Sequence, residues 1–229
     1  MGGLSLFLAQ AAAAQAIAYT DPAQAFNKMV LDKSTSASFE RIGSFKVIGT
    51  PFLYGDRNPA TVYAKEGTVS GILASYNTYA QQLEVYQSND DQKRLIKDAK
   101  TVDSFDLQPR GKMQMHFVSA AHLGSSKVKG FLLLVSDGPS YQLYKRYTSD
   151  LGIVTSNYID ASLRQYDLDY EFYYLDRKTR SLKKIRLTAY DVQKEFKDKI
   201  DLSGMLGNSS LPSDPEGTLK MIITQLNMQ

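Results

Sequence analysis

The sequence predicts a mainly β protein, an antiparallel sandwich or partial barrel with a short helical pair at its C-terminal end. Tyrosine and phenylalanine occur 15 and 10 times while tryptophan is absent, and aromatic side chains are enriched in strands. From residue 38 to residue 187, apolar and polar residues repeatedly alternate with the period of two that a strand imposes. After residue 187 the apolar spacing changes to the period of a helix. With 43% hydrophobic residues, the 229-residue chain can bury a core of its own.

The first predicted strands are short and separated by turn residues. Phe45–Ile48 reads as a strand that ends at a Gly-Thr-Pro turn. Thr61–Lys65 and Thr68–Tyr76 flank Glu66-Gly67, which predicts a tight hairpin. Residues on the two faces alternate again over residues 83–86, which predicts a strand, and the polar run 88–91 ends it.

The middle of the chain predicts an amphipathic strand followed by a buried one. Met113, Met115 and Phe117 alternate with polar neighbours, which is typical of a strand with one wet face. Phe131–Val135 is apolar at every position, so we expect a central strand there, ending at Asp137-Gly138-Pro139.

The clearest strand is Tyr166–Leu175, whose two faces differ in chemistry. One face carries aromatic and apolar residues and the other carries Asp167, Asp169 and Glu171. A polar turn leads into a second strand, Leu182–Leu187, so a hairpin is predicted. A register that pairs Phe172 with Ile185 would keep the apolar faces together and set Glu171 opposite Arg186.

Two helices are predicted in the tail. Thr188 caps the first helix, whose apolar stripe is Ala189, Val192 and Phe196. Asp214-Pro215 begins the second helix, and its apolar positions follow helical spacing: Leu219, Ile222, Ile223 and Leu226. We expect residues 188–229 to pack on the β-rich domain, residues 17–187, because a segment of about 40 residues rarely holds a core alone.

The N-terminal residues predict export. Leu4–Ala16 carries no charge and ends in Ala14-Gln15-Ala16, which fits a signal peptide over residues 1–16 cleaved before Ile17. No basic residue precedes this run, and an Ala-rich helix packed on the domain is the alternative. An apolar stretch of about 13 residues is too short to span a bilayer, which takes ~20. The expected location is the periplasm or the cell exterior, with residues 26–32 as a short helix or an extended lead-in.

Composition excludes several classes of chemistry. The chain has no cysteine, which removes thiolate catalysis, cysteine-ligated zinc, disulfides and lipid attachment through cysteine. The net charge of +3 gives no reason to expect a nucleic-acid partner, and no Gly-rich phosphate loop occurs. His116 and His122 are expected to face solvent, so neither a metal site nor a catalytic triad is predicted, and no cofactor is expected.

Charged segments have two interpretations each. Asp167, Asp169 and Glu171 could hold a cation or act as paired catalytic acids, but alternate residues of a strand lie ~6.6 Å apart, and pairing with Arg186 explains these acids more simply. The basic segment 177–186 could meet phosphate or an acidic polymer. The alternative is a hairpin tip whose charges keep a sheet edge soluble.

Tyrosines supply the candidate binding residues. Two groups stand out, and together they could form a surface for a sugar or an apolar ligand, or could serve packing alone: Tyr76, Tyr79, Tyr141, Tyr144 and Tyr147. On an extended strand Tyr141 and Tyr147 face one side and Tyr144 the other, so the second group cannot form a single platform.

Several segments resemble those of one group of proteins. Gly49-Thr50-Pro51-Phe52-Leu53-Tyr54, Ala60-Thr61-Val62-Tyr63, Tyr76-Asn77-Thr78-Tyr79 and the strand Tyr141–Tyr147 are similar to motifs of exported proteins of unknown function common in the Bacteroidetes phylum. Ser75 stands where that group usually has arginine, and the tail is less rich in lysine. The resemblance covers Gly49 to the C-terminus. It implies export and a β-plus-helix layout, and it carries no site residues.

We therefore expect an exported, non-enzymatic protein that binds or scaffolds at the cell envelope, its partner an envelope protein or a glycan. One alternative is a hydrolase that acts on envelope polymer through carboxylates such as Asp169 and Glu171. Another is a carrier of a small apolar ligand, which requires a cavity of several hundred Å3 inside the sheet.

Overall fold

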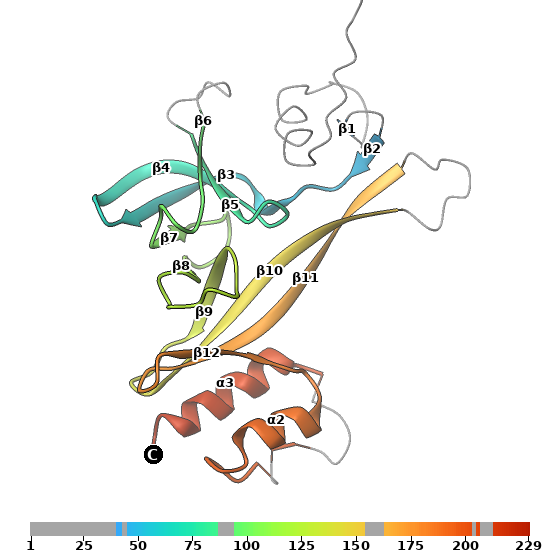
Figure 1. The fold of residues 1–229 in the computed structure, drawn as a ribbon. Helices are drawn as coiled ribbons and strands as arrows, with labels where there is room; N and C mark the ends of the chain where they lie inside the picture. The colour runs from blue at the N-terminus through green and yellow to red at the C-terminus, as the bar shows by residue number, and fades with distance from the viewer. Residues whose placement is uncertain (1–39, 43–44, 87–93, 154–162, 203–204, 207–212) are drawn as a thin grey trace, which may run out of the picture.

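A computed structural model describes residues 40–42, 45–86, 94–153, 163–202, 205–206 and 213–229 (Figure 1). The expected signal peptide, residues 1–16, and the lead-in over residues 26–32 lie outside the described residues, as does the polar run 88–91.

The described residues form one sheet of twelve strands and two helices. The strands are β1 (Glu40–Ile42), β2 (Phe45–Ile48), β3 (Phe52–Ala64), β4 (Gly67–Asn77), β5 (Gln82–Tyr86), β6 (Arg94–Lys97), β7 (Ser104–Leu107), β8 (Met115–Ser119), β9 (Phe131–Ser136), β10 (Tyr141–Ile153), β11 (Leu163–Asp176) and β12 (Ser181–Ile185). The order across the sheet is β1-β2-β11-β10-β9-β8-β7-β3-β4-β5-β6, and β12 pairs with β11 beside this path. The pairings are antiparallel except that of β2 with β11, which is parallel.

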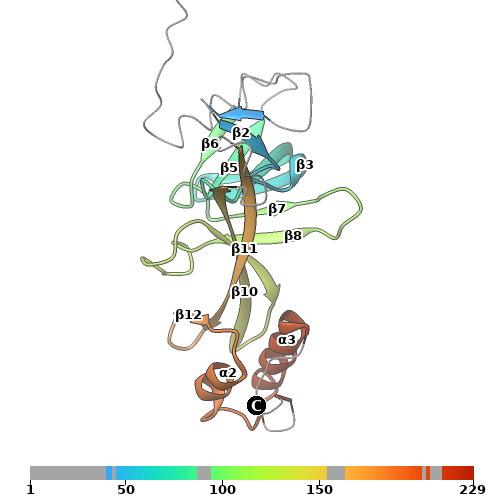
Figure 2. The ribbon, with the colours of Figure 1, turned by 90° about the vertical axis from the view of Figure 1, so that its right-hand side faces the viewer.

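The predicted fold class is confirmed: the protein is mainly β, with a short C-terminal helical pair. Helices α2 (Ala189–Phe196) and α3 (Pro215–Leu226) lie at one end of the molecule, below the long β10–β11 ribbon, while β3, β4 and β5 lie at the other end (Figures 1 and 2). The ribbon therefore joins the two ends.

The sheet curls back on itself at the end that holds β3 and β4. Tyr76 of β4 is fully buried, and its ring centroid lies 5.4–5.9 Å from those of Phe105, Phe117 and Phe131. Hydrogen bonds then join the turn after β4 to β10: the Thr78 and Ser149 hydroxyls are 2.6 Å apart, and the Gln81 amide donates to the Tyr147 carbonyl at 2.9 Å. This end of the molecule has the form of a partial barrel filled by aromatic rings.

A second core joins the helices to the ribbon. It contains Leu143, Phe172 and Tyr174 from the two long strands, Ile185 from β12, and the apolar stripes of both helices. The buried helix positions match those predicted from spacing, namely Ala189, Val192 and Phe196 in α2 and Leu219, Ile222, Ile223 and Leu226 in α3. Residues 188–229 thus pack on the sheet where they are described.

Several strand predictions are confirmed in detail. Ala64 pairs with Gly67 across the predicted tight hairpin. Phe172 pairs with Ile185, which is the register expected from matching the apolar faces. β9, over the all-apolar run, is an interior strand between β8 and β10.

Three details differ from prediction. β12 ends at Ile185, so Arg186 does not pair with Glu171, which instead contacts Arg146 and Lys184. On the apolar face of β11, Leu168 and Tyr170 are 55% and 40% exposed, because the ribbon there spans the gap between the two cores. Met113 precedes β8 and is exposed.

Candidate functional site

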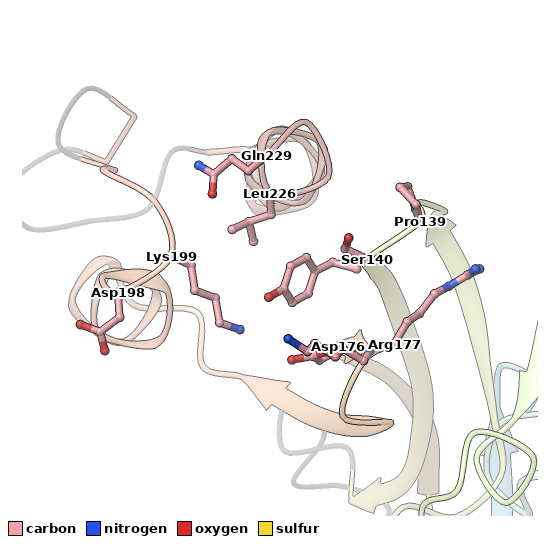
Figure 3. A pocket seen from close by; sticks show the side chains of 10 residues that line it. Pro139, Ser140, Asp176, Arg177, Asp198, Lys199, Leu226 and Gln229 are labelled. Atoms are coloured by element: carbon pink, nitrogen blue, oxygen red, sulfur yellow. Dashed lines mark hydrogen bonds between the residues drawn. The ribbon is translucent and has the colours of Figure 1, made fainter.

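A pocket of about 610 Å3 lies where two strand turns meet the ends of the two helices (Figure 3). Four segments line it: the β9–β10 turn, the β11–β12 turn, the residues after α2, and the end of α3 with the residues that follow it. The lining residues are Pro139, Ser140, Tyr141, Asp176, Arg177, Lys178, Asp198, Lys199, Leu226 and Gln229.

The β11–β12 turn is held by the carboxylate of Asp176. Its Oδ1 accepts hydrogen bonds from the backbone N–H groups of Lys178 at 3.0 Å and Thr179 at 3.2 Å. Burial alone would raise the pKa of Asp176, but these hydrogen bonds and the charge of Lys199 outweigh it and hold the pKa below its usual value. The carboxylate therefore stays ionised beside the pocket.

Asn227 fixes the end of α3 against the start of β10. Its Oδ1 accepts from the backbone N–H groups of Ser140 and Tyr141 at 2.9 and 2.8 Å, and its Nδ2 donates to the Tyr141 carbonyl at 2.9 Å. A side chain at Gly138 would place its Cβ 2.2 Å from Asn227 Nδ2, so glycine is needed for this close approach. The contact positions the neighbouring Leu226 at the pocket.

Lys199 is a partly buried residue whose ammonium lies beside three aromatic rings. Its Nζ lies 4.7 Å from the ring centroid of Tyr141, 5.0 Å from that of Tyr174 and 5.9 Å from that of Phe196. Within the described ranges, the ammonium makes no hydrogen bond or ion pair with the protein. In Figure 3 the side chain extends from the segment after α2 toward the space between Leu226 and Asp176.

The charges that line the pocket nearly balance. Among the lining side chains, Arg177, Lys178 and Lys199 are cationic while Asp176 and Asp198 are acidic, so these side chains carry one net positive charge. Arg177 donates to Asp137 at 2.8 Å and points away from Lys199 (Figure 3). The site can thus offer a ligand the cation of Lys199, the exposed cation of Lys178, hydrogen-bond acceptors and an aromatic ring.

The five predicted tyrosines do not converge on one surface. Tyr141 lines the pocket. Tyr76 is in the partial-barrel core, and Tyr79 packs edge-on against Tyr166. Tyr144 is buried on the opposite face of β10, with its hydroxyl 3.0 Å from Gln142.

Tyr147 lies on the same face of β10 as Tyr141, as the alternation predicts, but in the other core. Its hydroxyl is 3.2 Å from that of Tyr54, a residue with a positive φ of 61°. Burial raises the pKa of both hydroxyls, that of Tyr54 to about 12, so both remain protonated donors at neutral pH.

Sequence reasoning missed Lys199 and Asn227. Lys199 lies three residues after Phe196, a spacing that predicts contact with that ring. The other two rings come from β10 and β11, and no local pattern indicates them.

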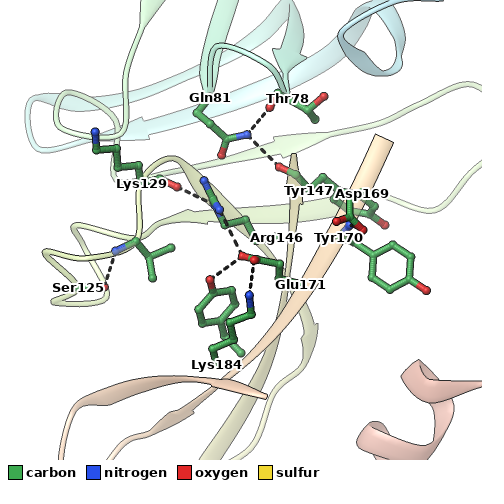
Figure 4. Close-up of polar contacts among 12 residues, drawn as sticks. Thr78, Gln81, Ser125, Lys129, Arg146, Tyr147, Asp169, Tyr170, Glu171 and Lys184 are labelled. Atoms are coloured by element: carbon green, nitrogen blue, oxygen red, sulfur yellow. Dashed lines mark hydrogen bonds and ion pairs between the residues drawn. The ribbon is translucent and has the colours of Figure 1, made fainter. Parts of the chain in front are cut away.

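The acids on β11 are partly neutralised by basic side chains, as Figure 4 shows for Glu171. The carboxylate of Glu171 lies 3.3 Å from Arg146, contacts Lys184 and accepts from the Tyr173 hydroxyl at 2.7 Å. Burial would raise the pKa of Glu171, but these partners outweigh it and lower that pKa. Asp167 and Asp169 are exposed.

The two histidines bind separate carboxylates rather than a shared ion. His116 Nδ1 lies 2.7 Å from Asp106, which also accepts from the Tyr63 hydroxyl, and His122 Nδ1 lies 3.3 Å from Asp103. Both rings are exposed to solvent, as expected. Across the part of the chain that the structure covers, no group of three or more potential metal ligands is found.

A second polar cluster lies at a distortion of β3, where Arg57 has a positive φ of 54°. Asp56 accepts from Ser75 at 2.6 Å and from Tyr86 at 2.7 Å. Beside them the buried Glu84 accepts from Arg94 at 2.9 Å. Because protein donors satisfy these carboxylates, the cluster is explained by stabilisation of the irregular strand.

Comparison with known protein families, curated proteins and solved structures found no match. The resemblance to exported Bacteroidetes proteins therefore stays a prediction. Among the helices that the structure describes, none is long and apolar enough to cross a membrane.

Proposed function

We propose that this protein is an exported, non-enzymatic binding protein of the cell envelope and that the pocket at its helical end is the ligand site. The observation that carries the proposal is the position of Lys199, which lines the pocket. The side chain is partly buried at the pocket, and its ammonium lacks an acceptor among the described residues. A cation held against aromatic rings still attracts an anionic acceptor, and a bound ligand would supply one.

Two features favour binding over the alternatives. Glu171, one of the acids considered for a hydrolase, is occupied by Arg146 and Lys184 on an open surface. The interior of the partial barrel, where an apolar ligand would have to lie, is filled by the rings of Tyr76, Phe105, Phe117 and Phe131.

Binding at the pocket is tested with a variant that fills it. Ser140 is exposed at the pocket, so Ser140→Trp should obstruct the ligand without disturbing a core. Ser70→Trp is the matched control, because Ser70 is an exposed residue of β4 at the other end of the molecule. Calorimetric titration with a panel of neutral sugars, sugar acids and small phosphates should find a compound that binds the unaltered chain and Ser70→Trp but not Ser140→Trp. A panel without any binder, or a binder that Ser140→Trp retains, contradicts the proposal.

Export is supported by the uncharged run Leu4–Ala16 and its A-x-A ending. Expression of the whole sequence in a Gram-negative host, followed by N-terminal sequencing of the periplasmic product, should give a chain that starts at Ile17. Ala16→Leu removes the small residue that cleavage needs and should block processing. Periplasmic material that starts before Ala16 would show that this segment is not the cleaved signal.

A further inference from the structure

Lys145 and Lys199 occupy similar surroundings but differ in one partner. Lys145 Nζ lies 4.2 Å from the ring centroid of Tyr170 and 5.1 Å from that of Tyr147. The same ammonium is 3.0 Å from the carboxylate of Glu216. Lys199 has comparable aromatic contacts and no carboxylate within ion-pair distance in the described part of the chain. Aromatic rings attract a cation but do not accept the hydrogen bonds that water gave it. Beside Lys145, the carboxylate of Glu216 accepts such a bond. Beside Lys199, a ligand can take the corresponding place.

The charge of the pocket limits the charge of that ligand. Asp176 and Asp198 line the pocket together with three cationic side chains, so the lining side chains carry at most a single positive charge in excess. A doubly charged phosphate monoester would meet repulsion from both carboxylates. A carboxylate carries one negative charge and forms a charge-assisted hydrogen bond with an ammonium. The pocket therefore favours a monoanion.

The remaining lining groups suit a ligand with several hydroxyls. Asp176 uses its Oδ1 to hold the turn, and a carboxylate has further lone pairs that accept O–H donors. Gln229 contributes an amide that both donates and accepts. Tyr141 and Leu226 add apolar surface, and about 610 Å3 lies within the range for small-molecule sites.

We propose that the ligand of this pocket is a sugar acid, a polyhydroxylated ring that carries one carboxylate, and that this carboxylate pairs with Lys199. The inference rests on the proposed function, because it names the ligand class of the same pocket. Lys199 sets the preference for an acid, while Asp176 and Gln229 receive the hydroxyls.

The test compares two sugars that differ in one group. The full chain is titrated calorimetrically with glucuronate and with glucose, which have the same ring and differ by the carboxylate. Glucuronate should bind at least about tenfold more tightly than glucose, because glucose lacks the carboxylate that pairs with the Lys199 ammonium. Inorganic phosphate, used as the third probe, should bind more weakly than glucuronate.

Two lysine variants locate the effect. Lys199→Met keeps an apolar side chain on the rings and removes the charge. It should weaken glucuronate binding by about tenfold or more and leave the affinity for glucose unchanged. Lys183→Met is the control, since Lys183 also faces the Tyr174 ring at 5.9 Å but does not line the pocket. It should leave both affinities unchanged. Circular dichroism and urea unfolding check that each variant is folded.

The outcomes separate this inference from the function on which it rests. Equal binding of glucose and glucuronate, lost in Ser140→Trp but kept in Lys199→Met, would overturn the sugar acid and leave the pocket as a binding site. Phosphate binding tighter than glucuronate through Lys199 would likewise overturn it. No binding of glucuronate overturns it directly, and the wider panel with Ser140→Trp then decides the proposed function.

Discussion

Tyr76 illustrates how this tyrosine-rich chain uses many of its aromatic residues. Its ring fills the partial barrel between three phenylalanines, and its hydroxyl lies 3.1 Å from Gln81 Oε1 and 3.3 Å from the Phe131 carbonyl. A tyrosine whose hydroxyl finds such partners can be buried completely. The side chain serves stability, and a ligand cannot reach it in this fold.

Substitutions at Tyr76 separate the contribution of the ring from that of the hydroxyl. Tyr76→Phe keeps the ring and should lower the free energy of unfolding by about 1 kcal/mol, the usual net value of one hydrogen bond. Tyr76→Ala leaves a cavity and should cost about 3–5 kcal/mol. Urea unfolding followed by circular dichroism measures both. Equal losses in the two variants would show that the ring contributes nothing.

Glu216 gives stability that depends on pH. Burial would raise the pKa of its carboxyl, but hydrogen bonds and charges from Lys220 and Lys145 outweigh burial and lower it. A carboxyl whose pKa is lower in the folded chain contributes stability above its unfolded pKa, about 4.3, and that stability is lost as the pH falls through the folded pKa.

Lys145→Met should therefore destabilise the protein by about 1 kcal/mol at neutral pH, a value limited by solvent at the partly exposed Glu216. The difference from the unaltered chain should shrink as the pH falls below about 4, because Glu216 is then protonated in both. Lys220→Met, which removes an exposed pair with the same carboxylate, should cost only a few tenths of a kcal/mol. Urea unfolding at neutral and acidic pH measures these differences in the free energy of unfolding. If the loss caused by Lys145→Met is the same at both pH values, the ion pair with Glu216 does not contribute.

At the scale of elements, local signals account for most helix and hairpin boundaries. Thr188 accepts from the Asp191 backbone N–H at 3.0 Å, and Asp214 accepts from that of Gly217 at 2.9 Å, so both caps lie where the sequence predicts them. The end of β12 is one residue earlier than Arg186 because its pairing with β11 ends where Phe172 meets Ile185. Glu171 then pairs with Lys184 of β12 and with Arg146 of β10, and the hairpin sequence alone does not indicate the partner from β10.

The β11–β12 turn contains a strained residue, Arg180, with φ of 52°. A left-handed conformation costs an L-residue roughly 1–2 kcal/mol and costs glycine almost nothing. Arg180→Gly relieves this strain, but glycine also gives the unfolded chain more conformational freedom, which opposes the gain. The net result should be a rise of about 0.5–1 kcal/mol in the free energy of unfolding. Arg180→Ala, which keeps the strain, should give no gain. Thermal unfolding compares the two, and equal midpoints would rule out strain at this position.

At the scale of the whole molecule, contacts between distant strands curl the sheet. Thr78 follows β4 and Ser149 belongs to β10, and four strands lie between these two in the sheet, yet their buried hydroxyls are 2.6 Å apart. Gln81 adds a second link to the same strand through the Tyr147 carbonyl. These hydrogen bonds turn an open sheet into a partial barrel.

A double-mutant cycle measures this closure. Thr78→Val and Ser149→Ala each remove one hydroxyl and leave the other buried without that partner, so each should cost about 1–3 kcal/mol. The double variant should cost less than the sum by about 1 kcal/mol, because the second change removes a group that has already lost its partner. Urea unfolding of the four proteins gives the coupling energy. Strictly additive losses would mean that the two hydroxyls do not interact.

The sequence by itself determined the features that depend on neighbouring residues. Alternation and helical spacing predicted the β-rich chain and its two helices, and matching of apolar faces predicted the pairing of Phe172 with Ile185. The N-terminal signal remains a prediction of the same local kind.

Only the tertiary structure decided the curl of the sheet and the candidate site. The pocket is assembled from residues near positions 140, 177, 199 and 227, which meet because the helices dock where the ribbon ends. Of the predicted tyrosines, it brings only Tyr141 there, beside Lys199. Local periodicity states which face of an element is apolar, but the partner that covers that face is chosen by packing over long distances in the chain.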